Sequence, residues 1–205
     1  MREPYTQLLL GTHYAMLRRE FWPWRTWTRD FPPRPRHILV TLGGSDPNNL
    51  TGQVLQAIEQ LHDPEATFVI VAGANSPHYP ALAKAAATST ACIELRHDVK
   101  DMSALMAWAD VAISAGGSTC WELAFMGVPN LIVILAENQR SSALRLAAEG
   151  VSQVLGWHED LAPAIILEKL RTMLEDLPRW KAMAHTGRSL VDGKGAERVV
   201  AAMQA

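Results

Sequence analysis

The stretch Asp110-Val-Ala-Ile-Ser-Ala-Gly-Gly-Ser-Thr-Cys-Trp-Glu122 decides the fold of this chain. Its apolar residues 111–113 predict a buried strand, which ends in small residues and a Gly-Gly pair. The residues that follow predict a helix, so the stretch forms a strand, a tight loop and a helix N-terminus. Free backbone N–H groups and the positive end of the helix dipole favour an anion at such a junction.

The small residues of this junction suit a phosphate. Gly116 and Gly117 let the backbone approach the ligand closely, because neither carries a Cβ atom. Ser118 and Thr119 can cap the helix or donate a hydroxyl to the ligand. Glu122 follows one turn later, either as an exposed helix carboxylate or as a partner for a ribose diol. A carboxylate this close to an anion would repel it unless it faced the ribose.

The pattern around this stretch alternates between strands and helices. Strands are predicted at 37–42, 68–72, 92–95, 111–114, 131–135 and 154–156. Helices are predicted at 49–61, 79–87, 102–109, 118–126, 138–149 and 165–174, with a final helix running to 203. Apolar strands alternating with helices predict a doubly wound α/β fold with a mostly parallel, Rossmann-like sheet. Ligands bind such folds beyond the carboxyl ends of the strands.

Composition excludes several classes of protein. The chain has 205 residues, 48% of them hydrophobic, which suffices for one substantial domain. A net charge of −2 leaves no electrostatic footprint for nucleic acid. We expect no membrane span and no signal peptide, because no apolar run approaches about 18 residues. The two cysteines, Cys92 and Cys120, cannot form a disulfide framework, so we predict a reducing, cytoplasmic location.

Residues 1–36 differ from the domain predicted at 37–205. They mix arginines with aromatic residues and end in Pro32-Pro33-Arg34-Pro35, which predicts an extended connector. Such a mixture can bind single-stranded nucleic acid. We favour aromatic side chains that pack on a neighbouring surface, such as a second domain. The aromatic residues are Phe21, Trp22, Trp24, Trp27 and Phe31.

A second glycine loop, Gly43-Gly44-Ser45-Asp46, ends the first strand. It lacks the Lys-Ser/Thr pair of a P-loop, so it is either a ligand-facing loop or a plain tight turn. Two Gly-Gly-Ser units that each follow a strand would meet at one edge of the sheet. This pairing favours the ligand-facing interpretation.

Two further segments lie at the same predicted edge. Val99 and Met102 could offer backbone hydrogen bonds and an apolar shelf to a base, although a solvated loop with Asp101 as helix cap is favoured from the residues alone. Asn138 and Gln139 could bind sugar hydroxyls, or Asn138 could cap the next helix.

The remaining reactive residues show no catalytic or metal pattern. The histidines lack metal-ligand spacing, so we predict no metal site and no cofactor. His78 and His97 lie in ligand-edge loops and are the two worth testing. Neither a nucleophile elbow nor a persuasive triad is present, so no catalytic residue is predicted in this chain.

The loop motifs, in this order, resemble a known family. Leu-Gly-Gly-Ser-Asp-Pro at 42–47, Val-Ala-Gly at 71–73, the glycine loop at 115–122 and Ala-Glu-Asn-Gln at 136–139 resemble the UDP-sugar hydrolases of pseudaminic-acid biosynthesis and the spore-coat polysaccharide proteins. Residues 10–21 resemble that family's connector between two domains. More distantly, Asp101-Met102, Trp108-Ala109-Asp110 and Glu122 resemble the peptidoglycan N-acetylglucosaminyltransferase. Both groups share the two-domain glycosyltransferase-B architecture.

The resemblance implies a role for each matching residue. Nucleotide binding would fall to Gly43, Gly44, Ser45, Val99, Met102, Gly116, Gly117, Ser118, Thr119 and Glu122. Within this set, Val99 would contact uracil, the second glycine loop would hold the diphosphate, and Glu122 would bind the ribose. Sugar binding would fall to Asp46, Asn138 and Gln139.

The family's N-terminal Rossmann-like domain, with its Gly-x-Gly-His-x-x-x-Arg motif, does not appear in this sequence, and His13 does not replace that histidine. We therefore expect the UDP- or UDP-sugar-binding half of a hydrolase acting on a UDP-2,4-diacetamido-2,4,6-trideoxyhexose, with the N-terminal domain as a partner in cis or in trans. The alternatives are the donor-binding domain of a glycosyltransferase, or a non-catalytic module that docks through Trp22, Trp24 and Trp27.

Overall fold

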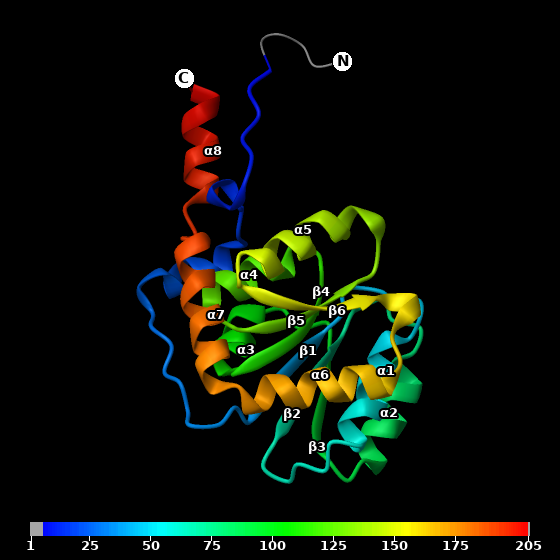
Figure 1. The fold of residues 1–205 in the computed structure, drawn as a ribbon. Coiled ribbons are helices and arrows are strands. Elements are labelled where there is room, and N and C mark those ends of the chain that lie inside the picture. Colours follow the sequence, from blue (N-terminus) through cyan, green and yellow to red (C-terminus); the bar gives the residue numbers. More distant parts are fainter. Residues whose placement is uncertain (1–5, 205) are drawn as a thin grey trace.

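The computed structural model describes residues 6–204 and contains a six-stranded sheet with all neighbouring strands parallel (Figure 1). The strands are β1 His37–Thr41, β2 Thr67–Ala72, β3 Cys92–His97, β4 Val111–Ala115, β5 Asn130–Ile134 and β6 Ser152–Trp157. Their order is β3-β2-β1-β4-β5-β6. The predicted doubly wound, Rossmann-like sheet is confirmed.

Helices cover both faces of the sheet. The α-helices are α1 Leu50–Glu59, α2 Tyr79–Thr88, α3 Met102–Trp108, α4 Thr119–Met126, α5 Glu137–Ala148, α6 Pro163–Glu175, α7 Leu177–Leu190 and α8 Gly195–Gln204. Short 3-10 helices are η1 Thr12–Tyr14, η2 Arg19–Thr26 and η3 His158–Asp160. Strand residues alternate between the two cores: Ile38 and Val40 pack with α1 and α6, whereas Leu39 packs with α3 and α4. This two-sided burial explains the apolar strands.

The connectivity creates a topological switch point at the carboxyl ends of the neighbouring strands β1 and β4. The strand β1 pairs with β2 on one side and with β4 on the other, with Thr41 level with Ser114. The chain runs outward from β1 to β3 and then returns to the centre at β4. Ligands of doubly wound folds bind at such a point, beyond the carboxyl ends of the strands.

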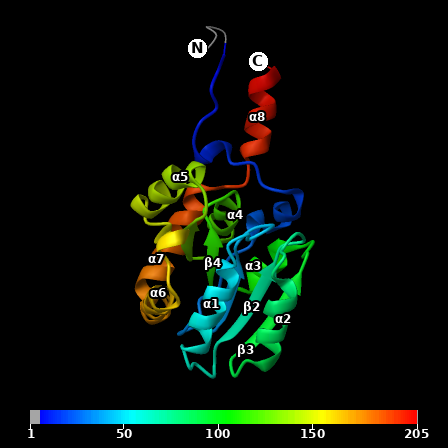
Figure 2. The ribbon, with the colours of Figure 1, turned by 90° about the vertical axis from the view of Figure 1, so that its right-hand side faces the viewer.

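The C-terminal region differs from the prediction of one final helix. It forms α7 and α8, separated by a turn at Gly193, which has φ +75°. A Cβ at Gly193 would stand 2.8 Å from the Phe125 ring, so the chain turns where a side chain would not fit. Helix α8 and the N-terminal segment both project from the body at the same end of the molecule (Figures 1 and 2).

The aromatic segment of the connector packs on its own domain and is not fully extended. Helix η2 passes through Pro23, and Phe21 is completely buried against the α3–α4 core. The Trp24 indole donates a hydrogen bond to Ser103 Oγ at 2.9 Å. Trp27 also packs on this core, while Trp22 stays exposed. Two of the three tryptophans expected to form a docking surface are therefore half-buried against apolar surface of this chain, and docking through all three stays a prediction.

Among residues 6–204, no helix combines the length and the apolar character that crossing a membrane requires.

Candidate functional site

The two glycine loops meet at the switch point, as their positions in the sequence predicted. One follows β1 and the other follows β4, and these strands are neighbours. Between the loops lies a cavity of about 470 Å³. It is lined by Leu42, Gly43, Gly44, Ser45, Asp46, Pro47, Ala115, Gly117, Ser118, Thr119, Leu135 and Gln139. We call it the switch-point pocket.

The glycines differ in what they permit. A Cβ at Gly44 or Gly117 would meet no atom within 4 Å, so both positions face open space. A Cβ at Gly73 would stand 2.2 Å from the Gly44 carbonyl oxygen, so the loop after β2 packs directly against the loop after β1. Gly44 and Gly117 thus leave room for a ligand. The missing side chain at Gly73 allows the loop after β2 to support the loop at Gly43–Ser45 by direct backbone contact.

The N-terminus of α4 offers unused hydrogen-bond donors. The first bonds of this turn run from Cys120 N to Gly117 O and from Trp121 N to Ser118 O. Within the described part of the chain, the N–H groups of Gly117, Ser118 and Thr119 find no acceptor. Together with the helix dipole, they form an anion-binding arrangement.

Ser118 occupies the N-cap position, but its hydroxyl makes no capping bond. The expected serine cap is therefore wrong, because Ser118 already has helical backbone angles, φ −59° and ψ −25°, instead of the extended ones that direct a cap. Ser118 is one of the residues that line the switch-point pocket. Of the two roles predicted for Ser118, only the ligand-facing one remains.

Buried polar side chains support the floor of the second loop. Asn130 Nδ2 donates to Ser114 Oγ at 3.0 Å, and the Cys120 thiol donates to the Ala115 carbonyl at 3.2 Å. Burial raises the pKa of the Cys120 thiol to about 11. Cys120 is therefore protonated at neutral pH and holds the loop without acting as a nucleophile.

Asp46 has a structural task that the sequence did not reveal. Its buried carboxylate accepts the N–H groups of Leu50 and Thr51 at 2.9 and 2.8 Å and so caps α1. Asn49, a predicted start of this helix, has a left-handed backbone and provides no side-chain cap. Sugar binding by Asp46 stays a prediction. Each of its carboxylate oxygens already accepts one backbone hydrogen bond, so a sugar contact would have to be added to these bonds.

The two predicted amides lie in different places. Gln139 lines the switch-point pocket, and its Oε1 accepts the Leu135 N–H at 3.0 Å. Asn138 is exposed and does not line the pocket. Capping by Asn138 is wrong, because α5 already begins at Glu137.

Glu122 is buried, so its interpretation as an exposed helix carboxylate is wrong. Arg18 of the connector donates two hydrogen bonds to its carboxylate, from Nε to Oε1 at 2.7 Å and from Nη2 to Oε2 at 3.1 Å. The bond to Glu122 raises the pKa of the Arg18 guanidinium. Sequence reasoning missed Arg18 as a site residue, although it lies in the connector motif that carried the resemblance.

The connector also covers the predicted base-binding segment. Glu20 accepts the Met102 N–H at 3.0 Å and pairs with Arg18 at 3.3 Å. Asp101 caps α3 by accepting the Ala104 N–H, as predicted. Val99 is half-buried against the α3–α4 core. Met102 and Glu122 therefore contact the connector, and none of Val99, Met102 and Glu122 lines the switch-point pocket.

The two histidines singled out make structural contacts. The His78 ring is 3.1 Å from the Pro47 carbonyl oxygen, and the His97 ring packs on Tyr79 with centroids 4.5 Å apart. Within residues 6–204, no group of three or more His, Cys, Asp or Glu side chains is placed to hold a metal ion.

The domain that carries the switch-point pocket matches a known protein family. Residues 37–199 match the glycosyltransferase family 28 C-terminal domain. The chain belongs to this family. Its match covers the whole sheet and every loop of the switch-point pocket.

Individual relatives agree with this assignment. Spore coat polysaccharide biosynthesis protein SpsG of Bacillus subtilis (strain 168) is 35% identical over 82% of this chain and 50% of its own length. The UDP-N-acetylglucosamine–N-acetylmuramyl-(pentapeptide) pyrophosphoryl-undecaprenol N-acetylglucosamine transferase of Acetivibrio thermocellus is 26% identical over 82% of this chain and 47% of its own length. The chain thus spans about half the length of these curated relatives.

Among solved structures, MurG of Acinetobacter baumannii superimposes with a TM-score of 0.71 at 22% identity, over 86% of this chain and 54% of that one. The likeness to the glycosyltransferase-B fold is confirmed. These relatives include a glycosyltransferase and no hydrolase, so they support the glycosyltransferase alternative better than the expected hydrolase.

Proposed function

We propose that this family 28 domain binds the nucleotide-sugar donor of a glycosyltransferase, with UDP or a UDP-sugar as its ligand. One observation carries the proposal. The unused N–H groups at the start of α4 face a pocket between two glycine loops, at the switch point of a doubly wound sheet. The name of the Acetivibrio thermocellus relative supports UDP as the nucleotide.

The diphosphate would lie against Gly117, Ser118 and Thr119. There the α4 dipole and backbone donors would stabilise the negative charge that grows on the diphosphate as the bond to the sugar breaks. Because these donors are fixed before the ligand arrives, they need no reorganisation during the reaction.

The nucleoside would extend from this pocket along α4. Glu122 would accept the ribose hydroxyls, and Val99 and Met102 would contact the base through backbone and apolar surface. The Met102 N–H and the Glu122 carboxylate are engaged by Glu20 and Arg18, so a bound nucleoside would share or displace these contacts.

The sugar would face the loop Gly43, Gly44 and Ser45, with Gln139 across the pocket. Asp46 and Asn138 remain candidates for sugar contacts in the ligand-bound state.

The remaining parts of the proposal concern the complete protein. Residues 37–205 would form the donor domain, and residues 1–36 would connect it to an N-terminal Rossmann-like domain in cis or in trans. That domain would supply the catalytic residues and bind the acceptor. The assembled protein would act in cytoplasmic polysaccharide biosynthesis, and its product would be a glycosylated acceptor, whereas a hydrolase would release free sugar.

Calorimetry on this chain tests the diphosphate site. Gly117→Val puts a side chain into open space at the pocket, so the fold should survive while UDP binding weakens at least about tenfold. Uridine, which lacks phosphates, serves as the control ligand and should bind both proteins alike. Unchanged UDP affinity in a folded Gly117→Val protein would show that the loop is only a turn.

Glu122→Ala tests the ribose site separately. Loss of a charged hydrogen bond should weaken UDP binding by about 1.5–3 kcal/mol. Inorganic pyrophosphate, which has no ribose, should bind this variant as it binds the unchanged chain. Equal UDP affinities for the two proteins would remove Glu122 from the proposed site.

A further inference from the structure

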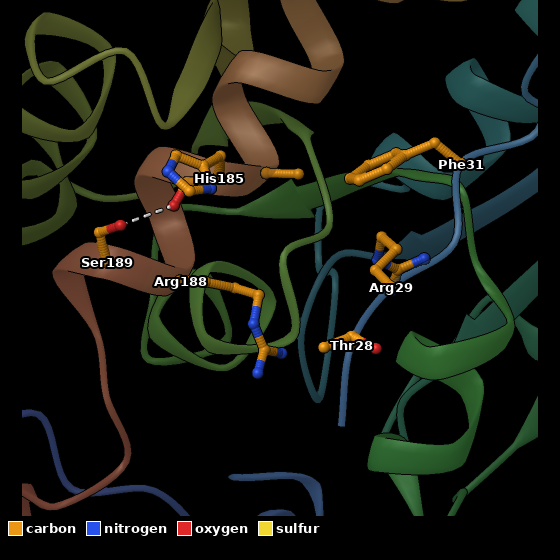
Figure 3. Close-up of a pocket in the computed structure, with 7 residues that line it drawn as sticks. Thr28, Arg29, Phe31, His185, Arg188 and Ser189 are labelled. Atoms are coloured by element: carbon orange, nitrogen blue, oxygen red, sulfur yellow. Dashed lines mark hydrogen bonds between the residues drawn. The ribbon is translucent and has the colours of Figure 1, made fainter. Parts of the chain in front are cut away.

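A second cavity, of about 320 Å³, lies between the connector and α7 (Figure 3). Its lining residues are Thr28, Arg29, Phe31, Ala184, His185, Arg188 and Ser189. We call it the connector pocket. It shares no lining residue with the switch-point pocket, and it lies by the C-terminal end of α4, whereas the switch-point pocket lies at the N-terminal end.

The connector pocket brings two guanidinium groups together. Arg29 donates to the carbonyls of Met106, Ala109 and Met126, at the C-terminal ends of α3 and α4. Arg188 donates from Nη1 to the Phe125 carbonyl at 3.1 Å. Both arginines therefore stand at the negative ends of helix dipoles.

The residues that line this pocket carry positive charge. Two guanidiniums are present and no carboxylate. The two helix ends offset about half a charge each, which leaves about one positive charge on the lining before Asp110 is counted. Asp110 acts on Arg29, but it lies outside the lining and already accepts the N–H groups of Arg36 and His37.

Burial makes this charge costly. It lowers the pKa of Arg29 to about 10 and also lowers the pKa of Arg188. Attraction to Asp110 opposes the effect on Arg29, and the smaller repulsion from Arg188 adds to it. Both groups still carry their charge at neutral pH. An anion between them would reduce the repulsion and the cost of burial.

Arg29 uses all of its donor nitrogens within the fold, whereas Arg188 is half-buried and keeps two nitrogens for other partners. All three nitrogens of Arg29 donate to carbonyls. Arg188 lies over the Trp27 and Phe125 rings, and its Nε and Nη2 donate to no atom of the described residues. Figure 3 shows Arg188 reaching from α7 into the space beside the connector.

Polar and apolar neighbours complete the lining. The Thr28 hydroxyl and the His185 ring have no hydrogen-bond partner within residues 6–204, whereas the Ser189 hydroxyl donates to the His185 carbonyl. Phe31, which packs on Trp180 with ring centroids 5.6 Å apart, forms the apolar wall. Unused donors beside paired guanidiniums are the chemistry that recognises a phosphate group.

We propose that the connector pocket binds a phosphate group, held by Arg188 and Thr28 in the field of Arg29. The group is either free phosphate or the phosphate of a small monoester. A bound phosphate would bridge the connector and α7 and would stabilise their packing. This inference is independent of the proposed nucleotide site.

The test follows the Trp27 indole N–H by NMR, because Arg188 lies 5.9 Å above this ring. The protein is titrated with inorganic phosphate and, separately, with glycerol 3-phosphate, at constant ionic strength. Chloride at equal ionic strength is the control. The Gly117→Val chain is titrated in parallel, which distinguishes phosphate bound in the connector pocket from phosphate bound at the start of α4. The source that binds more tightly identifies the form of the ligand.

Two pairs of variants make the result decisive. Arg188→Gln should weaken phosphate binding about tenfold or more, whereas Arg179→Gln, an exposed charge on the same helix, should not. Because Arg188→Gln also removes packing on Trp27, Ser189→Asp is compared with Ser189→Asn. The aspartate places a carboxylate in the pocket, so it should weaken phosphate binding about tenfold and raise the melting temperature relative to asparagine.

The same Asp and Asn changes at Thr186, which bonds its i−4 carbonyl as Ser189 does but lies outside the lining, should leave phosphate binding unchanged. Three results would overturn the proposal: no shift of the Trp27 signal beyond that with chloride, equal binding by Arg188→Gln and Arg179→Gln, or equal binding by Ser189→Asp and Ser189→Asn.

Discussion

Replacing Arg18 with glutamine removes the guanidinium that grips Glu122 across 104 residues of sequence. The Glu122 side chain is only 8% exposed, so it loses two charge-assisted hydrogen bonds where little water can replace them. Removing one partner of a fully buried pair costs about 3–5 kcal/mol. Because the Arg18 side chain is 48% exposed, solvent screens the pair, and we expect a loss of about 2 kcal/mol.

Urea unfolding, followed by circular dichroism, measures this loss. Arg19→Gln is the matched control, because Arg19 is the exposed neighbour and should change stability by less than about 0.5 kcal/mol. Glu122→Gln and the double variant complete a cycle, whose coupling energy should be about 1–2 kcal/mol.

Two outcomes would refute this reasoning. If Arg18→Gln costs no more than Arg19→Gln, the carboxylate does not depend on the connector. If the coupling energy is zero, the interaction between Arg18 and Glu122 contributes nothing to the free energy of unfolding.

Three further predictions concern buried groups. Phe21→Ala should cost about 3–5 kcal/mol in urea unfolding, because the ring is completely buried, whereas Trp22→Ala next to it should cost under about 0.5 kcal/mol; similar losses would mean that the connector does not pack as described. Burial raises the pKa of Cys120 from 9.0 to about 11, so Ellman's reagent at pH 8 should label exposed Cys92 and spare Cys120 until the chain unfolds. Because the folded state holds the Cys120 proton more tightly, stability should fall by up to about 3 kcal/mol as the pH rises from 9 through 11. Cys120→Ala should remove that part of the pH dependence, and a matching fall in this variant would contradict the assignment.

The order of elements was predictable because each depends on nearby residues. Apolar runs bounded by glycine define β1 and β4, and their order along the chain predicts that both glycine loops reach one edge. The break between α7 and α8 was missed because Gly193 was not recognised as a left-handed position in a helical pattern. Its need for glycine comes from Phe125, which is remote in sequence.

The assignment of site residues was less complete, because partners decide what a polar side chain does. Glu122 was recognised as a candidate site residue from its spacing to the glycine loop. Its hydrogen bonds with Arg18 could not be predicted, because they depend on how the connector folds back onto the domain. For Ser118 the sequence left both a cap of α4 and a ligand contact open, and the structure shows that its hydroxyl makes no capping bond. The capping of α1 by the Asp46 carboxylate was not predicted, and its sugar contact stays a prediction.

The sequence by itself determined the alternation of strands and helices and the junction of strand, glycine loop and helix N-terminus at 116–119, since both depend on residues a few positions apart. Only the tertiary structure decided which carboxylates are buried, which donors stay unused, and that Arg29 and Arg188 share one pocket. Those properties depend on distances between segments that are remote along the chain, and such distances exist only after the connector and α7 have packed onto the sheet domain.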